Sequence, residues 1–186
     1  MDRRVKYTKQ IIEETFLTLL QEKDISNITV TEICKIADIN RATFYRYYLD
    51  TYDLLKKIEG NFIDELKNSH PIEELKGHSV YSFTKEVLNI FINNKKLVKI
   101  LFNTNHNIYF LNEVLEVAYS KCYDLWSNKF PDSDLEEIEY SIIFIFNGAL
   151  GIINYWIKND FNEDIEVVSK QIENLSLFGA RKYITK

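Results

Sequence analysis

The sequence predicts an all-α protein, because three of its features favour helices over strands. Its 186 residues contain only 5 Gly and 2 Pro, too few for the many turns of a β-sandwich or barrel. Apolar residues recur at helical spacing along almost the whole chain. Polar residues that favour helix caps stand before several of these apolar segments. With 46% apolar residues, the chain can bury a core without disulfides, as one domain or as two small ones.

Two helices are expected in the first part of the chain. The first begins with Thr8 as its N-cap and ends near Lys23-Asp24. Its apolar face consists of Ile11, Ile12, Thr15, Phe16, Leu19 and Leu20. Thr29 and Glu32 then have the spacing of a capping box, in which each side chain bonds the other residue's free backbone amide. The short second helix that this box opens is expected to turn Ile33, Ile36 and Ala37 inward.

A turn at Asp38-Ile39-Asn40 separates this helix from a third, Arg41 to Tyr48. Asp and Asn tolerate the left-handed backbone that a tight turn needs, and Asn40 can cap the third helix. Asp50-Thr-Tyr-Asp53 repeats the capping pattern and opens a fourth helix that runs through Leu66. Two short helices joined by such a turn are a helix-turn-helix, whose second helix lies in the major groove of DNA.

The third helix has one inward and one outward side. Phe44 and Tyr48 form a single stripe that can anchor it on the core. The other residues can offer donors to phosphates and base edges, and Ala42 allows close backbone approach. They are Arg41, Ala42, Thr43, Tyr45, Arg46 and Tyr47. The pattern alone leaves open a second interpretation, a surface helix in an ordinary bundle.

The charge of the chain restricts how it could bind nucleic acid. The net charge of −5 excludes a generic basic polyelectrolyte binder. Residues 1–60 hold 10 basic and 10 acidic residues, against 13 and 18 in residues 61–186. The N-terminus is locally basic, with Arg3, Arg4, Lys6 and Lys9. Nucleic-acid binding would therefore have to come from a local surface of the N-terminal part.

The sequence predicts no catalytic residue, metal or cofactor. It contains no nucleophile elbow, phosphate-binding loop or dinucleotide fingerprint, and His70, His78 and His106 lack metal-ligand spacing. Cys34 and Cys122 are too few for a disulfide framework and are expected in the core. Because no secretory signal precedes the first helix, we expect a cytoplasmic protein.

The segment Ile28 to Tyr48, followed by Asp53-Leu-Leu55, resembles the N-terminal domain of TetR/AcrR-family transcriptional regulators. The likeness rests on Thr at the head of the second helix, Ala before the turn, and Thr-Phe-Tyr followed by an aromatic pair. It covers about residues 8–60 and is strongest toward the subgroup of low-GC Gram-positive bacteria that includes the dihydroxyacetone-kinase activator type. The remainder resembles the family in size and helical pattern only.

The resemblance implies DNA contacts at named positions. Phosphate contacts are expected from Thr29 or Thr31, and groove contacts from Arg41, Ala42, Thr43, Tyr45 and Tyr47. Lys35 and Arg46 are weaker candidates from the helix faces alone, and Asn40 and Thr51 complete the set. Two positions depart from the family, which usually has Gly at Asp38 and a phosphate-contacting Lys at Thr51.

Four or five further helices are expected after a boundary region marked by His70-Pro71 and Gly77-His78. Their expected spans are 79–93, 95–103, 108–130, 134–159 and 163–184. We expect residues 1–60 to form the helix-turn-helix domain and residues 61–186 to form a domain for ligand binding and dimerisation.

Ser141 to Ile157 is apolar except for two Asn residues, yet it is shorter than the roughly 20 residues of a membrane span. A helix that is apolar nearly all round must be buried on several sides, either inside a monomeric bundle or against a second chain. Because the resemblance implies that the last two long helices pair across a two-fold axis, we expect the second arrangement. The expected interface residues are Asn147, Gly148, Gly151, Asn154, Tyr155, Ile172 and Leu175.

The resemblance also implies an effector pocket among the middle helices. Its candidate residues are Phe83, Phe102, Tyr109, Phe110, Tyr123 and Trp126, although core packing is the favoured explanation for any single one of them. The expected function is that of a DNA-binding regulator, a ligand-responsive repressor that binds a pseudo-palindromic operator as a homodimer. One alternative is a co-regulator that acts through a protein partner without binding DNA itself. The other is a small helical enzyme or ligand carrier.

Overall fold

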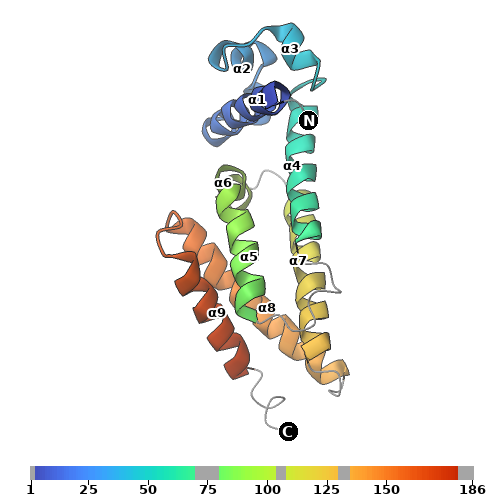
Figure 1. Cartoon of the computed structure of the whole chain (residues 1–186), viewed down its shortest axis with the longest axis vertical. Coiled ribbons are helices and arrows are strands. Elements are labelled where there is room, and N and C mark those ends of the chain that lie inside the picture. Colours follow the sequence, from blue (N-terminus) through green and yellow to red (C-terminus); the bar gives the residue numbers. More distant parts are fainter. Residues whose placement is uncertain (1–2, 70–79, 104–107, 130–134, 180–186) are drawn as a thin grey trace. The chain divides into compact units, whose positions relative to one another are not determined.

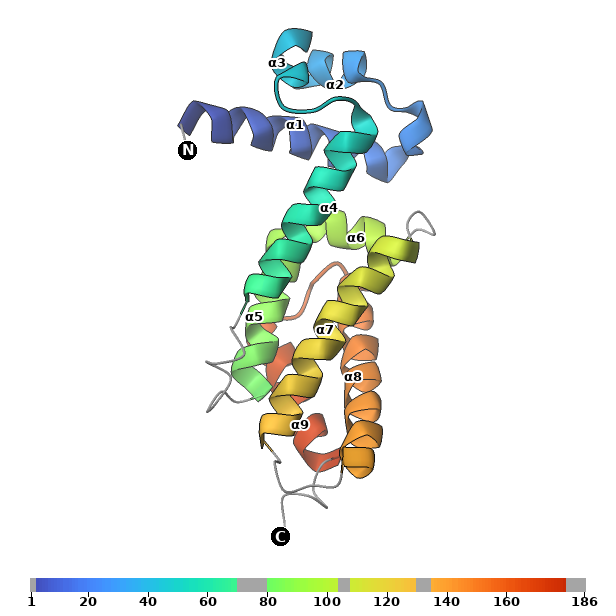
Figure 2. The same cartoon turned by 90° about the vertical axis from the view of Figure 1, so that its right-hand side faces the viewer.

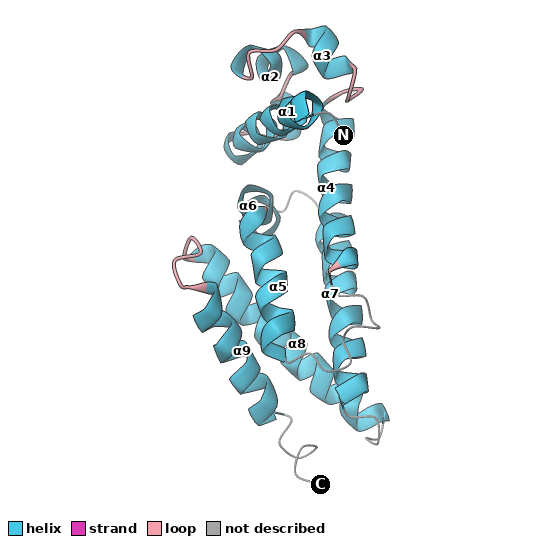
Figure 3. Cartoon of the chain, viewed as in Figure 1, coloured by secondary structure: helices cyan, strands magenta, loops and turns pink. Residues whose placement is uncertain are grey.

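A computed structural model gives the fold of the chain, and the predicted all-α class is confirmed (Figure 3). It describes residues 3–69, 80–103, 108–129 and 135–179. The chain divides into two compact units, Met1–Phe62 and Ile63–Lys186, and each is considered by itself below. The three His residues, the boundary near His70-Pro71 and the end of the last expected helix lie outside the described residues.

The first unit combines a long helix, two short helices and the start of a second long helix (Figure 1). These helices enclose a small apolar core. The unit contains α1 (Arg3–Glu22), a 3₁₀ turn (Ile25–Asn27), α2 (Val30–Ile36), α3 (Arg41–Tyr45) and the first part of α4 (Thr51–Asn68). The core takes side chains from all four α-helices, and its fully buried members are Ile12, Phe16, Ile33, Phe44 and Leu54. Because α2 contacts both α1 and α3, this core holds the two short helices in place.

Three local expectations for this unit were wrong. Helix α1 begins at Arg3, so Thr8 lies inside the helix and its hydroxyl donates to the Arg4 carbonyl oxygen at 2.9 Å instead of capping. Helix α3 ends at Tyr45, three residues early, and continues as a turn. Ile36 is 58% exposed, because the two-turn helix α2 directs Ile33 and Ala37, four residues apart, toward the core.

The second unit is a bundle whose helices agree with their expected spans to within a few residues. It contains the end of α4, α5 (Val80–Asn93), α6 (Lys95–Asn103), α7 (Ile108–Lys129), α8 (Leu135–Lys158) and α9 (Ile165–Gly179). Helix α5 packs along α9, and α8 packs on both α7 and α9 (Figure 2). Each long helix therefore has at least one side buried inside the unit.

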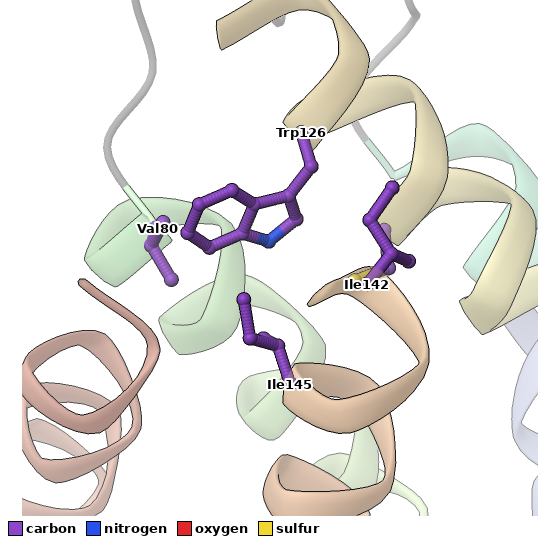
Figure 4. Packing of buried hydrophobic residues seen from close by; sticks show 5 residues of the cluster. Val80, Trp126, Ile142 and Ile145 are labelled. Atoms are coloured by element: carbon purple, nitrogen blue, oxygen red, sulfur yellow. The ribbon is translucent and has the colours of Figure 1, made fainter. Parts of the chain in front are cut away.

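A tryptophan on α7 organises part of this bundle. The indole of Trp126 lies among Val80 from α5 and Ile142 and Ile145 from α8 (Figure 4). All four side chains are buried, as is Cys122 one turn before Trp126. Burial of such a large aromatic side chain contributes about 2–3 kcal/mol to stability. The cluster therefore fixes α5, α7 and α8 against one another.

The connection between α8 and α9 is a tight turn with two left-handed residues, Asp160 (φ 59°) and Phe161 (φ 58°). A left-handed backbone is unusual for a bulky residue such as Phe. Here the Phe161 ring stacks edge-on against Trp156, with centroids 4.9 Å apart. The Trp156 indole also donates to the Glu163 carbonyl oxygen at 2.8 Å. These contacts compensate the backbone strain and return α9 along α8.

Candidate functional site

The two helices of the helix-turn-helix are set by their caps. Thr29 Oγ1 accepts a hydrogen bond from the Glu32 amide at 3.2 Å, and Asn40 Oδ1 accepts one from the Ala42 amide at 2.9 Å. Between them Asp38 adopts the left-handed conformation predicted for the turn, with φ 52°. The Glu32 carboxylate accepts hydrogen bonds from Lys23 Nζ at 2.6 and 2.7 Å. Local sequence signals thus define where α2 begins and ends and where α3 begins.

Helix α3 is anchored by the stripe that the sequence predicted. Phe44 and Tyr48 are buried, and their ring centroids lie 5.6 Å apart. The Tyr48 hydroxyl donates to the Glu13 carboxylate of α1 at 2.8 Å. Burial raises the pKa of Tyr48 far above its ordinary value, and the nearby Glu13 carboxylate raises it further. The phenol therefore keeps its proton and remains a donor, which ties α3 to α1.

A second attachment holds the corner between α3 and α4. Lys57 Nζ donates to the Tyr47 carbonyl oxygen at 2.9 Å and to the Asp53 carboxylate at 2.8 Å. The Asp53 carboxylate also accepts a hydrogen bond from the Leu49 amide at 2.9 Å. The bonds from Lys57 and Leu49 lower the pKa of Asp53. Sequence reasoning missed Lys57, whose only signal is its spacing of four residues from Asp53.

The outer side of α3 is polar and accessible. Arg41, Ala42, Tyr45 and Arg46 are exposed. Thr43 and Tyr47 are half-buried, and on α2 both Thr31 and Lys35 are exposed. The Arg41 guanidinium donates to the Thr31 hydroxyl, which joins one residue expected at the phosphates to one expected in the groove. Lys9 Nζ of α1, which the sequence-based site did not include, lies 5.6 Å from the centre of the Tyr47 ring.

Thr51 corrects one expectation about this surface. It is the first residue of α4 and only 7% exposed, so its side chain has little surface to present to a phosphate. The next residue, Tyr52, is exposed and has a phenol that can donate a hydrogen bond. The sequence could not show this difference, because both side chains are polar and adjacent at a helix start. Arg3, Arg4 and Lys6 add exposed positive charge at the beginning of α1.

The second unit contains a cavity of about 80 Å³ lined by side chains of α5, α6, α7, α8 and α9. Phe83, Phe102 and Trp126, all candidates from the sequence, line it. Three other candidates do not line it and correct the prediction. Tyr109 is 88% exposed near the start of α7, and Phe110 is buried without lining the cavity. Tyr123 is half-buried and packs against the cluster around Trp126, but it does not itself line the cavity. Helical spacing marks which residues share a face, but not which part of that face borders a space.

The outer side of α8 carries an exposed stripe of aromatic and small residues. Its members follow one another at intervals of three or four: Tyr140, Phe144, Gly148, Gly151 and Tyr155. Helix α9 adds exposed apolar side chains, which are Val167, Leu175 and Phe178. We call these eight residues the α8–α9 face. Within the described part of the chain, α8 is long and apolar enough to cross a membrane by length and composition alone, and only 28% of the segment Glu139–Lys158 is buried.

Three expected interface residues behave differently from the stripe. Ile172 is 3% exposed and lines the cavity, so its placement at an interface is corrected: it faces the interior of its own unit. Asn147 is exposed, and its amide donates to the Ile143 carbonyl oxygen of its own helix at 2.8 Å. Asn154 is half-buried, and its Oδ1 has no hydrogen-bond partner within the residues that the structure describes.

Known proteins resemble this chain in sequence and in fold. Residues 78–177 match the TetR C-terminal family model described as "Transcriptional regulator C-terminal region". An uncharacterized HTH-type transcriptional regulator of Bacillus subtilis (strain 168), YxbF, is 40% identical over 57 residues. That match covers 30% of this chain and 15% of the length of YxbF.

Two solved structures cover almost the whole chain. The dihydroxyacetone kinase operon activator DhaS is 22% identical, with 95% of this chain and 97% of that chain covered and a TM-score of 0.68. A transcriptional regulator from Aquifex aeolicus VF5 is 18% identical, with 92% and 99% covered and a TM-score of 0.69. At such identities the likeness shows a shared fold. The family model, by contrast, matches more than half of the sequence, and the chain therefore belongs to the TetR/AcrR family of transcriptional regulators.

Proposed function

We propose that this chain is a sequence-specific DNA-binding repressor that binds a pseudo-palindromic operator as a homodimer and responds to a ligand. The proposal assigns DNA binding to the first unit, and ligand binding and dimerisation to the second. The observation that carries it is the two-sided helix α3. Its apolar side is buried through Phe44 and Tyr48, while its polar side with Arg41 and Tyr45 is exposed to solvent and accessible to a partner.

The chemistry of the exposed residues supports DNA as that partner. An Arg side chain can donate two parallel hydrogen bonds to guanine or to a phosphate, and Thr and Tyr hydroxyls add single bonds. Arg41 and Thr31 are already in contact, so one residue can position the other on the duplex. Lys35 and Arg46 provide further exposed positive charge on α2 and α3. This local surface offsets the overall net charge of −5.

The α8–α9 face supports association with a second copy of the same chain. Aromatic side chains lie toward both ends of its α8 stripe, and Gly148 and Gly151 lie at its middle, where a Cβ atom would meet nothing within 4 Å. Two such stripes related by a two-fold axis would bring the glycines together and allow close helix approach. The unpartnered Asn154 oxygen could accept a hydrogen bond from that copy. Two copies of α3 would then read two half-sites about one DNA turn apart.

The cavity supports a response to a ligand, because it lies among the helices that also carry the α8–α9 face. A structural relative, FadR from Bacillus subtilis, was solved in complex with stearoyl-CoA. A ligand that fits one arrangement of two bound copies better than another shifts the population of DNA-binding dimers. Repression follows when an operator-bound dimer excludes other proteins from the same DNA, and ligand binding then relieves it.

Binding to the DNA upstream of the chain's own gene tests the proposal. We expect saturable binding by fluorescence anisotropy, with an affinity that falls steeply as salt increases. Arg41→Ala and Tyr45→Ala should each weaken operator binding about tenfold, with unchanged thermal unfolding because both side chains are exposed. Lys67→Ala is the charge-matched control for Arg41→Ala, since Lys67 is an exposed cation of the second unit.

Two outcomes would count against this assignment. If the substitutions at Arg41 and Tyr45 leave operator binding unchanged, α3 does not read DNA as proposed. If the purified chain binds no upstream DNA in a salt-dependent manner, the alternative of a co-regulator acting through a protein partner is favoured. The buried Thr51 and the acidic composition are the observations that favour that alternative.

A further inference from the structure

The cavity of the second unit is lined almost entirely by carbon. Among its described lining residues there is no Asp, Glu, Lys, Arg or His. The hydroxyl groups in the lining belong to Thr84 on α5 and Ser176 on α9, and Cys122 on α7 adds a thiol. Burial raises the pKa of the Cys122 thiol to about 12, so this group is neutral at physiological pH. The lining therefore contributes no formal charge.

Of the charged residues that adjoin the lining in sequence, Lys121 and Glu173 are buried, and both have other partners. Lys121 precedes the lining residue Cys122, but its ammonium group donates to the carbonyl oxygen of Ser69. Glu173 follows the lining residue Ile172, and its carboxylate accepts hydrogen bonds from the Tyr81 amide at 3.2 Å and from Lys170 Nζ at 2.7 Å. An ionised ligand in the cavity would thus lose its hydration without gaining an ion pair, which is strongly unfavourable.

The volume of about 80 Å³ also restricts the ligand. A dry apolar cavity of about 150 Å³ is known to hold benzene or xenon. The cavity of this chain is about half as large, so it has room for a molecule smaller than benzene and not for a long chain.

From the absence of charge in the cavity, its apolar lining and its small volume, we propose that it binds a compact, uncharged, apolar molecule with at most one hydroxyl or carbonyl group. The cavity rejects the corresponding carboxylate. This inference rests on the ligand response proposed above and specifies the chemistry of the ligand. The hydroxyl groups of Thr84 and Ser176 would accept or donate the single hydrogen bond that such a molecule can form.

The two Trp residues of the chain allow a direct test. Trp126 lines the cavity, whereas Trp156 is not part of the lining and stacks on Phe161. A Trp156→Phe variant therefore leaves Trp126 as the only indole fluorophore. The probes are matched neutral and anionic pairs at pH 7: ethanol against acetate, and 1-propanol against propanoate. We expect the neutral member of each pair to change Trp126 emission saturably and to bind at least tenfold more tightly.

Variants that fill the cavity identify the binding site. Ala118→Leu on α7 and Ala149→Leu on α8 place extra carbon in the lining and should reduce binding of the neutral probes at least tenfold. Ser120→Leu is the matched control, because Ser120 is an exposed residue of α7 outside the lining. Circular dichroism of all three variants checks that each one folds, and two filling variants on different helices keep the test valid if one does not.

The results separate this inference from the proposed function. Equal or tighter binding of the anions, binding that both filling variants leave unchanged, or no saturable binding by any probe would overturn the inference. Because the titrations contain no DNA, each of these results is independent of operator binding. Conversely, a neutral probe that binds in the cavity but leaves operator affinity unchanged would support the ligand class and contradict the ligand-responsive part of the proposed function.

Discussion

Asp38 shows how one residue can serve the turn of the helix-turn-helix at a cost in stability. Its φ of 52° lies in the left-handed region, where a side chain strains the backbone and glycine does not. Its negative charge also lies three residues before Arg41 in the sequence, beside the helix proposed to meet DNA phosphates. The family usually has Gly here, so this chain combines a compatible turn with an unfavourable conformation and charge.

Replacement of Asp38 should separate these two effects. Asp38→Gly removes the strain and the charge, so the free energy of unfolding in urea should rise by about 0.5–1 kcal/mol and operator affinity at low salt should increase. Asp38→Asn is the matched control, because Asn loses the charge but keeps a side chain that tolerates the left-handed conformation. It should gain affinity with little change in stability. A glycine variant less stable than the natural chain would show that the Asp side chain stabilises the turn.

At the scale of elements, the corner between α3 and α4 depends on one ion pair with a measurable signature. The Asp53 carboxylate, bonded by Lys57 and by the Leu49 amide, has a lowered pKa. A carboxylate of this kind contributes stability above its ordinary pKa, and the contribution disappears as pH falls through the lowered value. The corner should therefore keep its hydrogen bonds at mildly acidic pH and lose them only under more acidic conditions.

The Leu49 amide proton reports this titration by NMR. In Lys57→Met, which keeps the aliphatic length but removes the largest cause of the shift, the midpoint followed at Leu49 should rise toward the ordinary Asp value. Lys56→Met is the control, because Lys56 acts on Asp53 only weakly through its charge, and it should produce a smaller rise. Equal midpoints in the two variants would mean that Lys57 does not hold Asp53 in solution.

The elements also show how far sequence reasoning reaches. The caps at Thr29 and Asn40 were predictable, because each capping hydrogen bond joins residues at most three positions apart. The turn at Asp38 was predictable because its left-handed backbone depends on the residue type at that position. The solvent exposure of individual side chains was less predictable from the sequence. Ile172 lies toward the cavity and Tyr109 toward solvent because of how the other helices pack around them.

The partners of the anchoring side chains were beyond the sequence for the same reason. Tyr48 was predicted to be buried, and a buried phenol needs a hydrogen-bond partner, but Glu13 stands 35 residues earlier and on another helix. Only the fold brings the two groups together.

At the scale of the whole molecule, the proposed function depends on two copies of the chain. A single copy of α3 presents few positive charges, and a pair doubles the contacts while fixing their spacing. The same association would cover the α8–α9 face, whose apolar side chains one protomer leaves exposed. DNA affinity and dimerisation should therefore be lost together.

A charge placed on the α8–α9 face tests this dependence without disturbing the protomer. At Gly151 a new side chain meets nothing within 4 Å, and Gly→Glu in a helix is intrinsically favourable by about 0.5–1 kcal/mol. The Gly151→Glu variant should thus unfold no more easily than the natural chain. It should nevertheless sediment as a monomer and bind the operator at least tenfold more weakly. Gly60→Glu is the matched control, because Gly60 lies in α4 with equally open space and should remain dimeric. A Gly151→Glu protein that still sediments as a dimer would place the interface on another surface.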